Sequence, residues 1–228
     1  MNNQDTSKTS KEQRLERERK QRRDAIIETA MRFFIKEGYE QTMVEQIAKE
    51  AGYTKATIYN YFDSKEELYI GAVARTYENL FEVLDTYLSQ PGVNYELRSM
   101  GDAYLTFVER YPDQAGLFES GRLGLVIRGL IKKEEANELL AESEKEFRHH
   151  QLKVERLMTD VIVETMKASG VEGKVDPFSV IMALSTIGGA IRELVVRGMS
   201  GEEPREKTRE YLNVLFNIID RGLKNYGN

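Results

Sequence analysis

Residues 44–61 carry the pattern that most constrains how this chain folds. Ala48, Gly52 four residues later and Ile58 six residues after that have the spacing of a helix-turn-helix. There, a small residue lets two helices cross, a turn residue adopts positive φ, and an apolar residue packs the second helix onto the first. Glycine suits the turn because a left-handed backbone costs other residues about 1–2 kcal/mol. The spacing alone is equally compatible with an ordinary turn between two helices.

The surrounding residues favour a DNA-binding version of this motif. Three apolar residues complete the buried side of its first helix: Val44, Ile47 and Ala51. Its second helix would present polar and aromatic side chains to a major groove: Lys55, Thr57, Tyr59 and Asn60. Residues 8–23 upstream contain eight basic and three acidic side chains, and a capped helix follows at Ser64.

The rest of the chain predicts an all-α protein of nine or ten helices, because no run alternates as a strand does. A first helix places Ile27, Ala30 and Phe34 on one face and ends at Gly38. Capping boxes at Thr42–Glu45 and Ser64–Glu67 predict the starts of the second and fourth helices. Further helices are expected over 55–61, 64–89, 94–111 and 134–169, with a looser segment over 113–133. The last two begin at Asp176-Pro177 and Glu203-Pro204.

This organisation predicts three parts. Residues 1–19 form a flexible basic tail or a helix extension, 20–67 a helix-turn-helix DNA-binding domain, and 68–228 a larger helical domain for ligand binding and dimerisation. The basic segment 8–23 has two interpretations, a DNA-contacting arm or a solvated helix whose glutamates pair with nearby basic residues.

Composition excludes several classes of function. The chain of 228 residues has 33 basic and 38 acidic side chains, net −5, so its average charge does not favour a general polyanion binder. Cysteine is absent, and the two histidines, His149 and His150, are adjacent. No metal, cofactor or catalytic constellation is expected, so the chain is predicted not to be an enzyme. Without an apolar leader or a 20-residue apolar stretch, it is expected in the cytoplasm and not in a membrane.

These motifs, taken together with their spacing along the chain, resemble those of the tetracycline-repressor (TetR) family of bacterial transcription regulators. The resemblance runs from Arg23 to Leu68 and includes Gly38-Tyr39, Thr42, Ile47-Ala48, Ala51-Gly52, residues 54–59, Tyr61-Phe62 and residues 64–68. Tyr53 stands where a smaller aliphatic is usual, and Ala56 where glycine is frequent.

The resemblance implies which side chains meet an operator. The expected DNA-binding residues are Arg22, Arg23, Thr42, Thr54, Lys55, Thr57, Tyr59, Asn60, Tyr61 and Lys65. Thr42, Tyr59, Tyr61 and Lys65 would contact phosphates. Tyr61 has an alternative role, packing with Phe62 under the turn.

The resemblance also implies that the last two helices pair across a dimer, although packing within one subunit would produce the same apolar stripes. The expected interface is Leu184, Ile187, Gly188, Ile191, Leu194, Val195, Leu212, Leu215, Phe216 and Ile219. Aromatic and methionine residues could line a pocket for an apolar or aromatic effector, or simply fill the core: Tyr77, Phe81, Tyr104, Phe107, Phe118, Met158 and Met182.

The sequence therefore predicts a homodimeric, ligand-responsive repressor of a palindromic double-stranded operator, in which an effector biases the fourth helix and changes the spacing of the two DNA-binding heads. One alternative is a DNA-binding regulator of the same fold without a small-molecule ligand. A remote alternative is a helical carrier or enzyme.

Overall fold

The computed structural model describes residues 10–119 and 121–172 together with 176, 179–180 and scattered positions between 210 and 225. Side chains at 118, 119 and 121–123 are outside this description. Within the described residues the chain forms eight α-helices and one 3-10 helix, without a strand. The all-α prediction is thus confirmed. No helix in the described part is long and apolar enough to cross a membrane.

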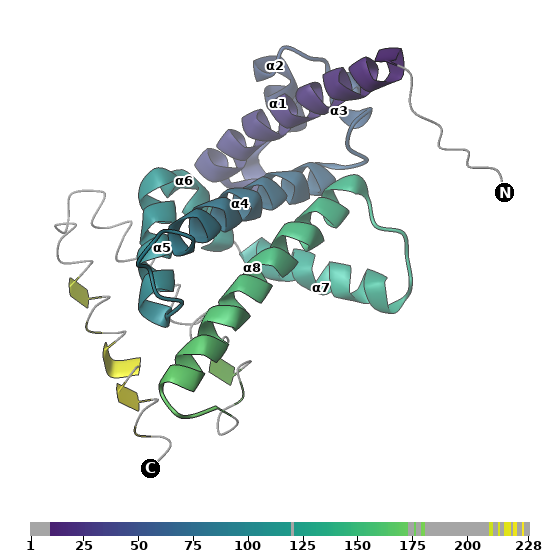
Figure 1. Ribbon diagram of the computed structural model, residues 1–228. Coiled ribbons are helices and arrows are strands. Elements are labelled where there is room, and N and C mark those ends of the chain that lie inside the picture. The colour runs from purple at the N-terminus through teal and green to yellow at the C-terminus, as the bar shows by residue number, and fades with distance from the viewer. Residues whose placement is uncertain are drawn as a thin grey trace. The chain divides into compact units, whose positions relative to one another are not determined.

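The chain divides into two compact units, residues 1–72 and 73–228, which we call unit 1 and unit 2. The helices are α1 (Ser10–Gln41), α2 (Val44–Glu50), α3 (Lys55–Tyr59), α4 (Lys65–Leu88), α5 (Leu97–Arg110), α6 (Pro112–Ala115), η1 (Gly116–Glu119), α7 (Gly121–Glu135) and α8 (Glu142–Ala168) (Figure 1). The boundary between the units falls inside α4.

Unit 1 is held by a small core that joins α1, α2, α3 and the start of α4. Ile27, Ile47, Ile58 and Leu68 contribute one buried side chain from each of these helices. Gly38 interrupts α1 with φ 77° and ψ 163°, so the regular helix stops where the sequence predicts. The predicted Ser64 N-cap of α4 is confirmed, because Ser64 Oγ accepts from the Glu67 N–H at 3.0 Å. The Glu67 carboxylate accepts from the Asp63 N–H at 2.6 Å, so the second half of the predicted capping box is shifted by one residue.

Two predicted helix starts are wrong, for different local reasons. The second helix begins at Val44 after Met43, and the Gln46 side chain accepts from the Met43 N–H at 3.2 Å, so Thr42 and Glu45 do not form a capping box there. The long helix expected over 134–169 is two elements, α7 and α8. Asn137, with φ 54°, breaks the helix because asparagine tolerates the left-handed region.

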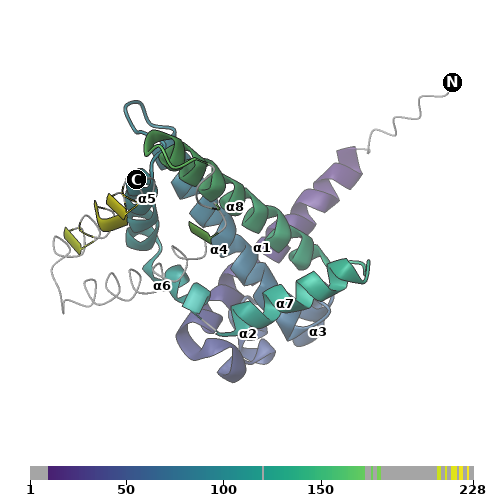
Figure 2. The same ribbon diagram turned by 90° about the horizontal axis from the view of Figure 1, so that it is seen from below.

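Unit 2 is built around a larger apolar core shared by the C-terminal half of α4, α5 and α8. Leu84, Phe107 and Val161 are buried members from these three helices. The Leu97 N–H donates to Thr165 Oγ1 at 3.1 Å, which ties the start of α5 to α8. Figure 2 shows α8 passing alongside α4 and α5. The segment expected to be loose, 113–133, is helical through α6, η1 and α7.

Candidate nucleic-acid interface

The turn between α2 and α3 has the geometry that a helix-turn-helix requires. Gly52 adopts φ 76°, and the Tyr53 N–H donates to the Ala48 carbonyl at 2.8 Å. Ala48 is 2% exposed and Ile58 is 1% exposed, so the small residue and the apolar residue both pack inside. The predicted helix-turn-helix is therefore confirmed, with Tyr53 accommodated in place of a smaller side chain.

The start of α3 is organised by its own threonines. The Thr57 N–H donates to Thr54 Oγ1 at 3.1 Å, and the two hydroxyl oxygens are 2.9 Å apart. This N-cap fixes the first turn of a helix that is only five residues long. Thr54, Lys55, Tyr59 and Asn60 are exposed, and Thr57 is half-buried. Four of the five predicted residues of this segment therefore face solvent.

Lys55 is held by an acidic residue that sequence reasoning did not place in the site. Its Nζ lies 2.5 Å from Glu45 Oε1, and 5.8 Å from the centre of the Tyr59 ring. The hydrogen bond from Lys55 lowers the pKa of Glu45, and the same bond raises the pKa of Lys55. Glu45 lies ten residues upstream of Lys55, so only the crossing of α2 and α3 reveals the pair.

Lys65 sits at the start of α4 over an aromatic group. Its Nζ is 4.4 Å from the centre of the Tyr39 ring and donates to the Glu40 carbonyl at 3.4 Å. Tyr39 in turn stacks on Phe34 at 5.8 Å and meets Tyr69 edge-on at 5.2 Å. The ring is thus fixed from two sides, and it restricts where the ammonium can go. Tyr39 is a further residue that the predicted set omitted, although it stands in the Gly38-Tyr39 motif.

Two predicted DNA-binding residues are buried. Arg23 is 3% exposed, with its guanidinium 5.2 Å from the centre of the Phe62 ring. Thr42 is 1% exposed, and its hydroxyl donates to the Gly38 carbonyl at 2.7 Å and lies 3.2 Å from that of Phe33. Neither side chain presents its polar group to solvent. Both instead stabilise unit 1, Arg23 under the turn and Thr42 at the end of α1.

The remaining predicted residues lie at the border of the motif. Arg22 is exposed, and Tyr61 is half-buried with the Arg19 guanidinium 5.8 Å from its ring centre. Tyr61 therefore keeps part of its surface accessible while packing against α1. Unit 1 thus places five exposed predicted side chains around the turn, Arg22, Thr54, Lys55, Tyr59 and Asn60, and three half-buried ones, Thr57, Tyr61 and Lys65.

In unit 2, five of the seven predicted pocket residues meet in one apolar cluster: Tyr77, Phe81, Tyr104, Phe107 and Met158. Phe107 is 0% exposed, while the other four are partly buried around it. Burial raises the pKa of Tyr77 to about 12. Phe147, which is buried and meets the Tyr77 ring edge-on at 5.3 Å, was not among the predicted pocket residues. The Phe118 side chain and Met182 lie outside the described residues.

The predicted dimer interface is largely outside the described part of the chain. Ile219 is described, and it packs against the core cluster of unit 2. The other nine lie outside: Leu184, Ile187, Gly188, Ile191, Leu194, Val195, Leu212, Leu215 and Phe216.

Known proteins are similar to this chain at two levels. Residues 26–72 match the pattern of bacterial regulatory proteins of the tetR family. The HTH-type regulator YuxN of Bacillus subtilis is 40% identical over 62 residues, 27% of this chain and 21% of YuxN. The negative regulator IcaR of the Staphylococcus aureus icaADBC biofilm operon is 30% identical over 93 residues, 39% of this chain and 49% of IcaR. The chain thus matches no more than half the length of these two relatives.

The fold likeness extends further than the sequence likeness. The crystal structure of FadR from Bacillus subtilis, in complex with stearoyl-CoA, matches with a TM-score of 0.56 and 17% identity, over 87% of this chain and 97% of FadR. The pattern match ends at residue 72, which is also where unit 1 ends. Residues 26–72, which hold the helix-turn-helix geometry, thus carry the likeness to the tetR family of bacterial regulatory proteins.

Proposed function

We propose that this chain is a ligand-responsive transcriptional regulator that binds an operator through α3 and the start of α4. The observation that carries the proposal is a set of polar side chains, the exposed Thr54, Lys55 and Tyr59 with the half-buried Lys65, beside a turn whose packing residues are buried. Hydroxyl, phenol and ammonium groups suit base edges and phosphates in a major groove. The likeness to IcaR, a negative regulator, supports repression as the mode of action.

The proposed active form is a homodimer on a palindromic operator. Two α3 helices would enter successive major grooves, with half-sites about 34–36 Å apart or a little more. Because one five-residue helix reads few bases, pairing two copies is what supplies enough contacts for specificity. The protein would act in the cytoplasm, where its operator is accessible.

The proposed effector is a small molecule with an apolar or aromatic body. The partly buried Tyr77, Phe81, Tyr104 and Met158 surround the core of unit 2 and offer adaptable apolar surface. The fold likeness to FadR, solved with stearoyl-CoA, supports an acyl thioester as the first compound to try. Since α4 contributes Leu68 to unit 1 and Leu80 to unit 2, an effector that shifts α4 would act on both.

The test begins with selection of bound duplexes from a random library by the full-length protein. Tyr59→Ala and Lys65→Ala should each weaken binding to the selected operator by about 10- to 100-fold, since one good DNA contact is worth about 1–3 kcal/mol. Tyr95→Ala and Lys145→Ala, exposed residues of unit 2, are the matched controls and should bind as wild type does. Light scattering should give the same dimer mass for all four variants. Failure to enrich any duplex would contradict the proposal.

The effector is tested on the same complex. Stearoyl-CoA should release the protein from its operator, and free coenzyme A, which lacks the acyl chain, should not. Retention of the complex with stearoyl-CoA and a series of shorter acyl thioesters would favour the alternative, a regulator of this fold without a small-molecule ligand.

A further inference from the structure

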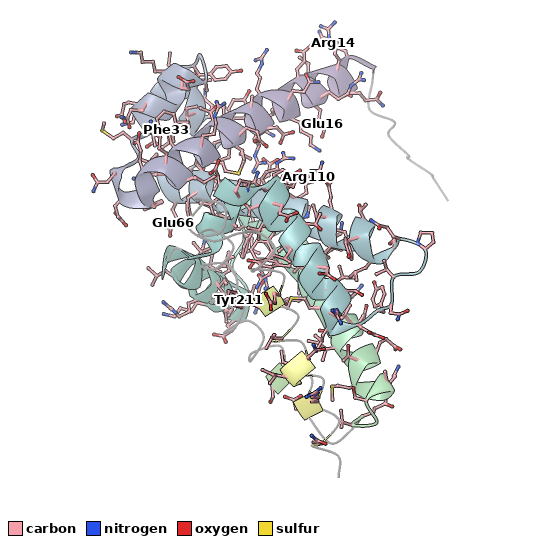
Figure 3. All side chains as sticks on the ribbon, turned by 90° about the vertical axis from the view of Figure 1, so that its left-hand side faces the viewer. Arg14, Glu16, Phe33, Glu66, Arg110 and Tyr211 are labelled. Carbon is pink, nitrogen blue, oxygen red and sulfur yellow. The ribbon has the colours of Figure 1, made fainter. Side chains whose placement is uncertain are left out.

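The first turns of α1 form a charged rod outside the core of unit 1. Residues 11–22, which we call the α1 extension, are helical, and every side chain in it is exposed except that of Glu18, which is half-buried. Arg23 is the first buried residue of α1. Figure 3 labels Arg14 and Glu16 on this segment, on opposite sides of the helix. The core of unit 1 therefore does not explain why these residues are present.

The α1 extension carries the positive charge that the rest of unit 1 lacks. It contains six basic and three acidic side chains, net +3, whereas residues 23–72 contain six basic and nine acidic, net −3. A body of net −3 repels the phosphates that its turn is proposed to approach. Lysines and arginines that neutralise phosphates supply a large share of protein–DNA affinity. Besides Lys55 and Lys65 at the proposed half-site, the α1 extension offers six further basic side chains for this contribution.

Contacts at the base of the extension link it to the recognition motif. The Arg19 guanidinium lies 5.8 Å from the centre of the Tyr61 ring, and that of Arg23 lies 5.2 Å from the centre of Phe62. Tyr61 and Phe62 directly follow α3. The extension consequently leaves unit 1 beside the recognition helix, and residues 11–18 continue about 12 Å further at 1.5 Å per residue.

The exposed basic groups of the extension can exchange their present partners for phosphates. Arg14 Nε is 3.4 Å from Glu18 Oε1, and Arg17 Nε donates to the Gln13 carbonyl at 3.3 Å. Ion pairs this exposed contribute little to stability, so breaking them costs little. A partner helix is a poor occupant, because Leu15 is the one large apolar side chain in residues 11–22 and a helix pair needs an apolar stripe.

We propose that the α1 extension binds the phosphate backbone of duplex DNA just outside each half-site, through Lys11, Arg14 and Arg17. These contacts are independent of base sequence and lengthen the operator that one protomer covers. About 12 Å of helix spans the axial rise of three to four phosphates on one strand. This inference rests on the proposed DNA binding by α3.

The test compares two duplexes that carry the operator selected by the wild-type protein. One ends at the outer edges of the half-sites, and the other continues for ten base pairs of unrelated sequence on each side. The variant is full-length Lys11→Gln/Arg14→Gln/Arg17→Gln, which keeps side chains of similar helix propensity. Its matched control is Lys132→Gln/Lys145→Gln/Arg156→Gln, which removes the same charge from exposed positions of unit 2.

On the longer duplex, wild type and control should bind more tightly than on the shorter one, and with a steeper salt dependence. On the longer duplex, the extension variant should bind at least about 10-fold more weakly than wild type near 0.15 M salt. Its plot of log Kobs against log salt concentration should be shallower, by about 0.9 in slope for each phosphate contact that is lost. Its hydroxyl-radical footprint should shorten at both outer ends, and its affinity for the short duplex should stay within about 2-fold of wild type.

Two results would overturn the inference while leaving DNA binding by α3 intact. One is an extension variant with the wild-type slope and footprint on the longer duplex. The other is an equal loss of affinity by the extension variant on both duplexes, which would place the contacts of Lys11, Arg14 and Arg17 inside the half-site. If wild type itself enriches no duplex, the proposed function fails instead, so the two failures are distinguishable.

Discussion

Unit 1 and unit 2 use aromatic and charged side chains differently. In unit 1, cations lie over rings near the surface, as Lys55 does over Tyr59 and Lys65 over Tyr39. In unit 2, most rings of the apolar cluster pack on other rings, as Tyr77 does on Phe147 and Tyr104 on Phe107, although Lys153 also lies 5.1 Å from the centre of the Phe81 ring. Residues 1–72 hold 13 basic and 13 acidic side chains, and residues 73–228 hold 20 and 25.

This difference matches two kinds of recognition. A cation held over an exposed ring has lost some conformational freedom in advance, so less entropy is lost when it meets a phosphate. A cluster of partly buried rings provides apolar surface, which suits either a packed core or an apolar effector. Unit 1 depends on where its exposed cations are placed, whereas unit 2 depends on apolar volume.

The largest expected effect tests the dependence of unit 2 on its core. Phe107→Ala should lower the free energy of unfolding by about 3–5 kcal/mol, because Phe107 is fully buried at the centre of the cluster. Urea denaturation followed by circular dichroism measures it. The same substitution at the half-buried Phe81 should cost less. If Phe107→Ala also abolished operator binding by the folded protein, the separation of roles between the units would be wrong.

A smaller effect tests the turn of unit 1. Gly52→Ala should destabilise the protein by about 1–2 kcal/mol, since φ of 76° strains a residue with a Cβ although no atom lies within 4 Å of it. Gly116→Ala is the control, because Gly116 has φ −65° and open space around its Cβ position. Thermal melts of both variants measure the difference. Equal stability of the two would mean that the turn relaxes to a negative φ.

The smallest effect concerns His150 in unit 2. Burial lowers the pKa of His150 below its ordinary 6.5, and Glu78, with Oε1 4.0 Å from Nε2, opposes that shift while His149, Lys153 and Arg75 add to it. As pH falls below 6.5, His150 is therefore protonated in the unfolded state before it is protonated in the folded state. The free energy of unfolding consequently decreases as the pH decreases. His150→Gln should flatten the dependence of melting temperature on pH between 7.5 and 5.5. His149→Gln, at an exposed position, should not flatten it.

Sequence reasoning succeeded where structure is set by neighbours along the chain. Ser64 caps α4 and Gly52 turns the chain, because a side chain hydrogen-bonding three residues ahead and a glycine at positive φ act locally. It failed at the α7–α8 break, where Asn137 takes a positive φ in place of a glycine. Glu144 then accepts from the Ala141 N–H at 2.8 Å and from Lys133, eleven residues upstream, at 2.6 Å. The Lys133 pair forms only when α7 folds back on α8.

In the binding site the same distinction holds. The residue types of the motif predicted a set of DNA-contacting side chains, but not that Arg23 and Thr42 turn inward or that Glu45 and Tyr39 hold the two lysines. Burial and cross-helix pairing depend on how α1, α2 and α3 cross, which spacing along one helix does not contain.

The sequence by itself determined the all-α class and the helix-turn-helix, because local hydrogen bonding, turn chemistry and helical periodicity are written in consecutive residues. The tertiary structure decided which candidate side chains are exposed, which acid pairs with Lys55, and that residues 11–22 leave the core as a separate charged rod. Those outcomes depend on packing between segments distant in sequence. Burial, and not residue type, then determines whether a cation is available to a phosphate.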